Sequence, residues 1–236
     1  MTAVQHSSRR AQRRVETVGE IKARAMEQIT AGGVEQLSLN AVARSMSMAP
    51  AALYRYFPSK DALLADLVVE AYDSLAGALE RAAAAEPPGA ARLAEVVRGY
   101  RTWALGQPNA YLLVFQQPSG NGEQLAPERT LPAAVRSMDV FLGALAELPP
   151  PGDLALDATL SQQIARWGGR TRIPDLPVDT LALGLVCWTR LHGLISLELN
   201  RHLAATGIDP ERLYEHEVQA LLSLATTDSN RPSVGF

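Results

Sequence analysis

The segment of residues 37–64, LSLNAVARSMSMAPAALYRYFPSKDALL, gathers side chains whose types and spacing suit contact with a polyanion. Arg55 and Lys60 can neutralise phosphate groups, and the phenol of Tyr54 can donate a hydrogen bond to one. Asn40 can bond a base edge or a phosphate. The chemistry on offer is therefore recognition of a nucleic acid.

The distribution of charge agrees with this chemistry. Residues 1–60 carry nine Lys or Arg and four Glu, a net charge of +5, whereas the rest of the chain carries thirteen basic and twenty-one acidic residues, a net charge of −8. A basic amino-terminal quarter on an acidic body is typical of a polyanion-binding module joined to a part that does not bind polyanions. Taken alone, this difference in charge is also compatible with a chance difference of a few charges between two parts of a chain. The basic tract Arg9–Arg14 can reach along a nucleic-acid backbone or into a minor groove.

Two short helices must position these side chains. A helix over residues 39–46 buries Leu39, Val42 and Ala43, a turn follows at 47–50, and a second helix is predicted over 50–57. Proline suits the first turn of that second helix, since its missing N–H would be unpaired there. This pattern predicts a helix-turn-helix, whose second helix lies in the major groove of DNA.

The same residues carry a family resemblance. Ser38 at the start of the first helix, Ala43, and the string LYRYFPSKDAL at 53–63 resemble the tetracycline-repressor (TetR) family of transcriptional regulators. The resemblance covers roughly residues 15–65. Further along, the string WTRLHG at 188–193 looks like the Trp-x-x-x-His-Gly signature of a family subgroup, which implies a WHG-type carboxy-terminal domain.

The resemblance implies which positions meet DNA. They are Ser38, Asn40, Pro50, Ala51, Ala52, Tyr54, Arg55, Tyr56 and Lys60. The two alanines can give only apolar contact, such as with a thymine methyl group. For Tyr56, packing under the recognition helix is as strong an expectation as contact with DNA. Arg44 is expected on a solvated helix face.

Two residues depart from the family pattern. Ser47 stands where the turn commonly has glycine, a residue that adopts positive φ without strain. Ala49 stands where a serine or threonine commonly caps the recognition helix, and alanine is a poor cap. The start of the recognition helix is therefore expected to be looser than usual.

Apolar periodicity elsewhere predicts an all-α fold of nine or ten helices. The first ends at Gly32-Gly33, and Ser59 is expected to cap the long helix at 60–85. The others are predicted near 90–106, 109–117, 127–147, 154–168, 179–204 and 210–226. A three-helix DNA-binding domain is expected over 1–60 and a helical ligand and dimerisation domain over 61–227, with disorder at residues 1–12 and in a tail at 228–236.

Several functional classes are excluded by what the sequence lacks. A single cysteine (Cys187) and four scattered histidines predict no disulfide framework and no metal site. No catalytic motif is present, so we expect no catalytic residue, no cofactor and no enzyme activity. The amino terminus has no apolar core, and prolines interrupt the uncharged stretch 102–122, so neither secretion nor membrane insertion is predicted. The protein is expected in the cytoplasm.

The acidic body offers aromatic side chains in a weakly charged region. The resemblance implies that such domains hold a small-molecule inducer among their middle helices. The candidate ligand-binding residues are Trp103, Tyr111, Phe115, Met138, Phe141, Trp167, Trp188 and His192. For any one of them, packing in a core is the more common role.

The last two helices are apolar on more than one face. A helix that packs on one core needs one apolar stripe, so a second stripe predicts another partner, most simply the same helices of a second subunit. The candidate dimer-interface residues are Leu183, Cys187, Leu194, Leu197, Val218 and Leu222. Deep burial of both helices within a monomer remains the alternative.

These inferences together predict a ligand-responsive transcriptional regulator. We expect a repressor that binds a palindromic operator in double-stranded DNA as a homodimer and is released by a small apolar or aromatic inducer. One alternative is a DNA-binding regulator without an inducer, controlled by a protein partner. A small helical enzyme with an incidental basic amino terminus is a further alternative.

Overall fold

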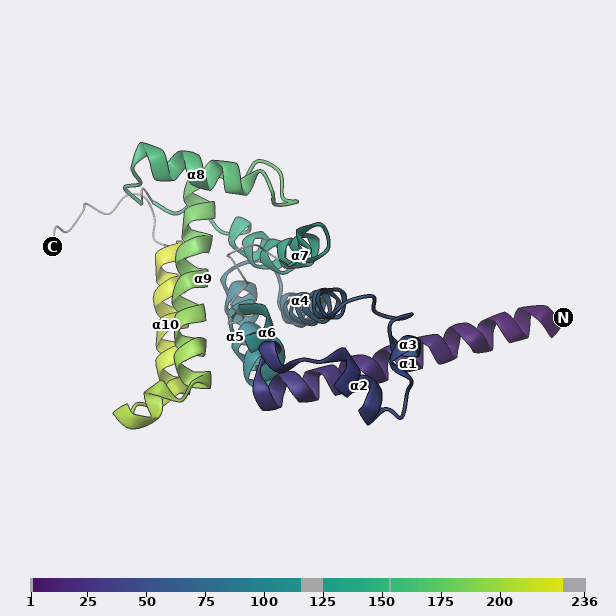
Figure 1. Cartoon of the computed structure of the whole chain (residues 1–236). Coiled ribbons are helices and arrows are strands. Elements are labelled where there is room, and N and C mark those ends of the chain that lie inside the picture. Colours follow the sequence, from purple (N-terminus) through teal and green to yellow (C-terminus); the bar gives the residue numbers. More distant parts are fainter. Residues whose placement is uncertain (1, 116–124, 153, 227–236) are drawn as a thin grey trace. The chain divides into compact units, whose positions relative to one another are not determined.

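The structure, a computed structural model, describes residues 2–115, 125–152 and 154–226, with side chains from residue 9 onward. Within these ranges it contains helices and no strand, which confirms the all-α prediction (Figure 1). The helices are α1 (Thr2–Gly32), α2 (Leu39–Ser45), α3 (Pro50–Leu53), α4 (Lys60–Ala85), α5 (Ala90–Gly106), α6 (Pro108–Phe115), α7 (Pro127–Ala146), α8 (Ala158–Gly168), α9 (Val178–Leu199) and α10 (Pro210–Thr226). Two short 3₁₀ helices, η1 (Val34–Gln36) and η3 (His202–Thr206), complete the described elements.

The prediction of disorder at residues 1–12 is wrong from residue 2 onward. Helix α1 begins at Thr2, because residues 2–12 contain neither glycine nor proline and several are good helix formers. Further along α1, the Gln12 side chain donates a hydrogen bond to Glu16 at 3.1 Å, one turn away. The predicted tail at 228–236 lies outside the described residues.

Three other predicted helix boundaries shift. The recognition helix is a single turn, Pro50–Leu53, followed by a hydrogen-bonded turn, rather than a helix to residue 57. Helix α8 begins at Ala158 because the Asp157 carboxylate caps it, accepting from the Leu160 N–H at 2.9 Å. Helix α9 ends at Leu199, before Arg201 takes a left-handed conformation with φ of 59°.

The chain forms two compact units. Unit 1 comprises Met1–Ala71 and Asn109–Thr130, and unit 2 comprises Tyr72–Pro108 and Leu131–Phe236. The predicted domain boundary at residue 60 falls inside unit 1, because the first turns of α4 supply part of the core of that unit. Helices α4 and α7 both begin in unit 1 and continue into unit 2.

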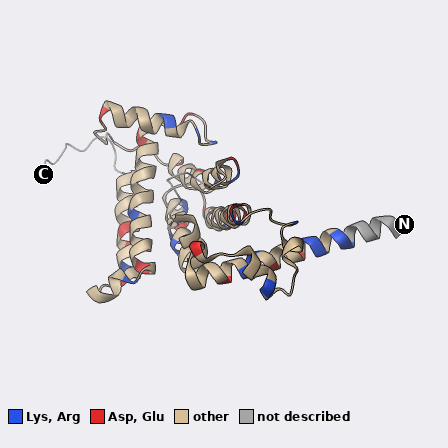
Figure 2. Cartoon of the chain, viewed as in Figure 1, with Lys and Arg blue, Asp and Glu red and all other residues tan. Residues whose placement is uncertain are grey.

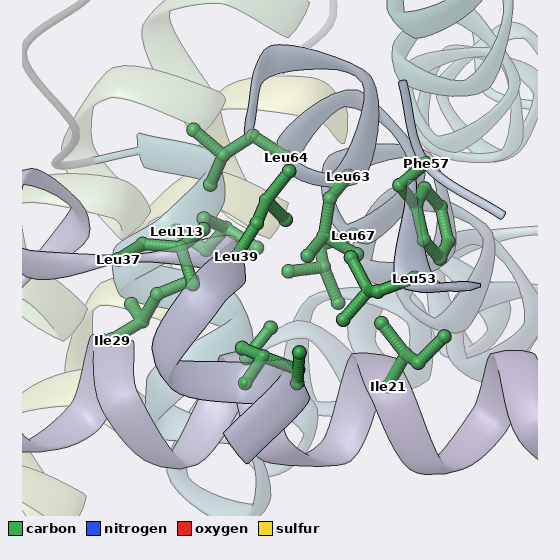
Figure 3. Packing of buried hydrophobic residues seen from close by; sticks show 13 residues of the cluster. Ile21, Ile29, Leu37, Leu39, Leu53, Phe57, Leu63, Leu64, Leu67 and Leu113 are labelled. Carbon is green, nitrogen blue, oxygen red and sulfur yellow. The ribbon is translucent and has the colours of Figure 1, made fainter. Parts of the chain in front are cut away.

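The core of unit 1 lies beneath the helix-turn-helix segment (Figure 3). Ile21 and Ile29 on α1 pack with Leu53 of α3, Leu63 of α4 and Leu113 of α6. The start of α4 is fixed as predicted, since the Ser59 hydroxyl accepts a hydrogen bond from the Ala62 N–H at 3.0 Å. Together these contacts hold the turn at residues 50–57 on a packed core.

Unit 2 is centred on α9. This helix lies beside α10 and α5, and α8 crosses one end of it (Figure 1). By length and composition alone α9 could span a membrane, but 44% of its most apolar window is buried within the protein. Gly184 allows α9 to approach α7 closely, because a Cβ there would lie 2.5 Å from a methyl group of Leu142. Packing against several helices thus explains why α9 is apolar on more than one face.

Candidate nucleic-acid interface

The turn before the recognition helix carries both residues that depart from the family pattern. Ser47 adopts φ of 52°, in the left-handed region, and the Met48 N–H donates to the Ala43 carbonyl at 2.9 Å. Ala49 occupies the cap position of α3 and makes no side-chain cap hydrogen bond. Neither serine in the left-handed region nor alanine at a cap is the most stable choice.

Restoring the usual residues should stabilise unit 1. Ser47→Gly relieves the positive φ, and Ala49→Ser supplies an acceptor for the first N–H groups of α3. We expect each substitution to raise the free energy of unfolding by about 0.5–1 kcal/mol. Denaturant unfolding of the two variants and of the double variant measures this. A decrease in stability for both would contradict the proposed origin of the strain.

The structure places most of the predicted DNA-binding side chains on the surface. Asn40, Pro50, Ala51, Tyr54 and Arg55 are exposed. Their neighbours in sequence, Leu53 and Phe57, are buried in the core of unit 1. The turn therefore alternates between anchoring and exposed positions, which presents Tyr54 and Arg55 to a partner.

Ser38 and Lys60 also have structural roles. The Ser38 hydroxyl caps α2 by accepting from the Ala41 N–H at 3.3 Å. The backbone N–H of Ser38 donates to the Gln28 side chain. The Lys60 ammonium donates to the backbone carbonyl of Glu35 at 3.1 Å. An ammonium has three donors, so this bond leaves Lys60 able to meet a phosphate as well.

Tyr56 and the half-buried Ala52 lie at the edge of a groove. The ring of Tyr56 packs partly on the core, and the guanidinium of Arg14 lies over its face, 5.0 Å from the ring centroid. The groove has a volume of about 960 Å³ and is lined by Arg10, Ala11, Arg13, Arg14, Thr17, Met48, Ala52, Arg55 and Tyr56. The sequence identified the basic tract, but it did not predict the contact of Arg14 with Tyr56. The spacing of Arg10 and Arg14, one helical turn apart, indicates that both lie on one helix face, but no signal in the sequence pairs that face with Tyr56.

The predicted ligand-binding residues do not come together as one set. Tyr111 and Phe115 lie in unit 1, with ring centroids 5.1 Å apart, whereas the remaining candidates lie in unit 2. Met138, Trp167, Trp188 and His192 are half-buried in unit 2, and Trp103 and Phe141 are buried there.

Three of the unit 2 candidates belong to a chain of stacked rings and hydrogen bonds. Trp188 stacks on His192 at 5.6 Å, and the Nδ1 of His192 lies 3.2 Å from the Tyr100 hydroxyl. Tyr100 stacks on Trp103, whose indole N–H donates to the Ser74 hydroxyl on α4 at 3.2 Å. These contacts link side chains of α9, α5 and α4 in that spatial order.

Burial of His192 has a consequence for stability at low pH. Burial lowers the pKa of His192 below its ordinary value of 6.5, so the unfolded chain binds the proton more tightly than the folded one. Stability is therefore constant above the ordinary pKa and falls as the pH drops below it. We expect His192→Gln to lose less stability than the parent protein between about pH 7.5 and about pH 5.5, by denaturant unfolding at each pH. Equal losses in both proteins would refute this.

The predicted dimer-interface residues divide into two groups. Leu183, Cys187 and Val218 are each 1% exposed, so they belong to the core of the protomer and have no surface left for a partner. Burial also raises the pKa of the Cys187 thiol to about 12. Leu194 and Leu222 are half-buried, and Leu197 is 42% exposed.

Two further positions of α9 that the sequence did not single out lie on its outer face, the side that carries exposed residues. Val186 is exposed, and a Cβ at Gly193 would meet nothing within 4 Å. Val186, Arg190, Gly193 and Leu197 follow one another at steps of four, three and four residues, which places them on one helix face. That spacing was present in the sequence, but the apolar residues on every side of α9 concealed it.

No group of three or more His, Cys, Asp or Glu side chains that could hold a metal ion occurs within residues 2–115, 125–152 and 154–226.

Comparison with known proteins supports the assignment of the helix-turn-helix. Residues 21–67 match the bacterial regulatory proteins of the tetR family, and residues 93–221 match the tetracyclin repressor-like C-terminal domain. The HTH-type transcriptional regulators Rv1816 of Mycobacterium tuberculosis and Mb1846 of Mycobacterium bovis are each 29% identical over 199 residues, which is 81% of this chain and 85% of theirs.

Solved structures show the same architecture. The crystal structure of the regulatory protein SCO4313 is 35% identical, covers 90% of this chain and 98% of its own, and superposes with a TM-score of 0.77. The regulator FadR from Bacillus subtilis, solved in complex with stearoyl-CoA, shares the fold at 16% identity and a TM-score of 0.57, over 86% of this chain and 97% of its own. The proteins of this family regulate transcription and are not enzymes. The chain belongs to the TetR family of transcriptional regulators.

Proposed function

We propose that the protein is a cytoplasmic repressor that binds a palindromic operator as a homodimer and leaves it when a small apolar or aromatic inducer binds unit 2. The exposed pair Tyr54–Arg55, held between the buried Leu53 and Phe57, carries the DNA-binding part of this proposal. A guanidinium and a phenol on a fixed turn suit hydrogen bonds to phosphates and base edges.

The inducer part rests on the contact between α5 and the part of α4 that belongs to unit 2. The Ser74 hydroxyl of α4 accepts from the Trp103 indole and donates to the Gln107 side chain at 3.1 Å. A ligand that displaces the rings around Trp103 would therefore act on the helix whose first turn follows the recognition segment. FadR, which shares the fold, was solved with stearoyl-CoA, a ligand that joins a long acyl chain to the charged coenzyme A group. The acyl chain agrees with the apolar class of inducer proposed for this chain.

Ion pairs on α4 and α7 support a mechanical role for these two helices. In unit 1, Arg129 of α7 pairs with Asp66 of α4. In unit 2, Arg136 of α7 bonds Asp73 at 3.0 Å and Glu80 at 2.7 Å, both on α4. The partners repeat every seven residues on each helix, so the same sides of α4 and α7 are paired at both places, and we infer that α7 moves with α4.

The coupling has a thermodynamic requirement. The inducer must bind the DNA-incompetent state more tightly than the DNA-bound state, and DNA must weaken the inducer by the same factor. Recognition helices of a dimer must lie about 34–36 Å apart to enter successive major grooves. A tilt of α4 that changes this spacing is enough to release the operator.

Selection of bound fragments from genomic DNA by the purified protein tests the proposal. We expect recovery of a palindromic sequence, with an affinity that falls steeply as salt rises. Arg55→Ala should weaken binding to every duplex, whereas Arg44→Ala, an exposed arginine on α2, should serve as the matched control. Recovery of no enriched sequence, or equal binding by the two variants, would overturn the assignment.

A regulator controlled by a protein partner is the second candidate function. The observation that favours it is the burial of Trp103 and Phe141, which contribute to a packed core in unit 2. Small molecules screened for a rise in melting temperature separate the two. Compounds that stabilise the protein and release DNA support the inducer, and stabilisation with unchanged DNA affinity supports the partner.

A further inference from the structure

The amino-terminal half of α1 carries a concentration of positive charge that the recognition turn does not account for. Arg9, Arg10, Arg13 and Arg14 lie within six residues, and all four are exposed. Figure 2 shows these basic positions on the part of α1 that runs beyond α2 and α3. Because this part is helical, the arginines have defined directions rather than the freedom of a flexible arm.

Three of these arginines share one groove with the recognition segment. Arg10, Arg13 and Arg14 of α1 line it together with Arg55 and Tyr56. The described lining of this groove contains no Asp or Glu. Four guanidinium groups around one groove repel one another, and an anion bound between them would relieve that repulsion.

The contact between Arg14 and Tyr56 fixes the direction of this part of α1. The guanidinium lies over the ring at 5.0 Å from its centroid, a cation–π geometry. Tyr56 is itself packed on the core of unit 1, so the contact ties the arginines of α1 to the base that carries Arg55. A guanidinium stacked on a ring keeps N–H donors at its edge for a phosphate.

We propose that the amino-terminal turns of α1 are a second DNA-binding element, which binds the phosphate backbone of the duplex beside the phosphates met by the recognition turn. This inference rests on the DNA binding proposed above and extends it. The arginines follow the helix axis, with Arg10 and Arg14 about 6 Å apart. A row of cations along an open groove, continuous with Arg55, suits a linear polyanion better than a single free phosphate.

The salt dependence of binding to a mixed-sequence duplex of 30 base pairs tests this element. The test variant is Arg10→Gln, Arg13→Gln and Arg14→Gln together. The control removes the same charge from exposed arginines of unit 2, with Arg166→Gln, Arg170→Gln and Arg212→Gln. Each phosphate contact contributes about 0.9 to the slope of log affinity against log salt.

We expect the control to keep the slope of the parent protein and the α1 variant to lose about two to three units per protomer. A variant with Lys at all three α1 positions should keep most of the slope, because the charge remains. An unchanged slope in the glutamine variant overturns the α1 element. Failure of the DNA-binding proposal gives a different result, since the parent protein would then show no salt-dependent binding to the duplex.

A double-mutant cycle tests whether Tyr56 orients α1. Tyr56→Leu keeps apolar packing but removes the ring, and we expect it to weaken duplex binding several-fold in the parent protein. After Arg14→Gln, the same substitution should add little, since the contact is already lost. Additive effects of the two substitutions would refute the orienting role. Far-ultraviolet circular dichroism of each variant confirms that helix content is retained.

Discussion

Replacing Leu53 with alanine is expected to abolish DNA binding at temperatures where the parent protein is fully active. Leu53 is 0% exposed and lies directly before the exposed pair Tyr54–Arg55, where it packs into the core of unit 1. Removal of a buried leucine side chain costs about 2–5 kcal/mol, because transfer energy is lost and a cavity remains. Such a loss is a large fraction of the stability of a small domain.

A neighbouring substitution separates loss of folding from loss of contact. Tyr54 is 45% exposed, so Tyr54→Ala should change the free energy of unfolding by only about 0.5 kcal/mol while still weakening DNA binding. Denaturant unfolding and duplex binding are measured on both variants. If Leu53→Ala kept the free energy of unfolding of the parent protein, the core packing described beneath the recognition turn would be wrong.

Local signals in the sequence predicted the helix-turn-helix to within a few residues. Glycine, proline and capping residues act over a single turn, so Ser59 could be identified as a cap without knowledge of the fold. The positive φ at Ser47 and the weak cap at Ala49 lie at the two positions where the sequence departs from the family pattern, so the resemblance was needed to identify them. The helical state of residues 2–12 was missed because a polar segment without apolar periodicity resembles a disordered one.

Long-range contacts were not predictable in the same way. Periodicity shows that α9 is apolar on several faces, but it does not say which face the protomer itself covers. Only the packing of α9 against other helices of unit 2 shows that Leu183 and Cys187 are internal while Leu197 is exposed. The contact between Arg14 and Tyr56 joins positions 42 residues apart, and no local rule connects them.

The aromatic candidates show the same limit. Tyr111, Phe115 and Trp103 all fall in the uncharged stretch 102–122 and were all candidates for one ligand-binding set. The structure assigns the first two to unit 1 and Trp103 to unit 2, because the chain passes from one unit to the other between residues 108 and 109. Composition identified a weakly charged region, whereas the partners of each ring depend on the topology.

Placing a carboxylate on the outer face of α9 is expected to prevent dimer formation. Leu197 is 42% exposed and shares its face with Val186 and Gly193, where the absence of a side chain allows close approach of a partner helix. In a two-fold symmetric interface the same patch occurs on both subunits. Arg190 on the same face is already paired with Glu217. Leu197→Glu therefore introduces two carboxylates without a partner into this contact, and burial of an unpaired charge costs about 3 kcal/mol or more.

Sedimentation at micromolar concentration measures the outcome. The parent protein should sediment as a dimer, at twice the chain mass of 25.4 kDa. A cost of about 3 kcal/mol raises the dimer dissociation constant roughly 100-fold, so Leu197→Glu should sediment as a monomer.

Leu160→Glu on α8 is the matched control, because Leu160 is 41% exposed but lies on another helix. It should remain dimeric and keep its affinity for a palindromic duplex, whereas Leu197→Glu should lose most of that affinity because one recognition turn reaches only one half-site. A monomeric parent protein, or a Leu197→Glu variant that still forms dimers, would exclude this face of α9 from the interface.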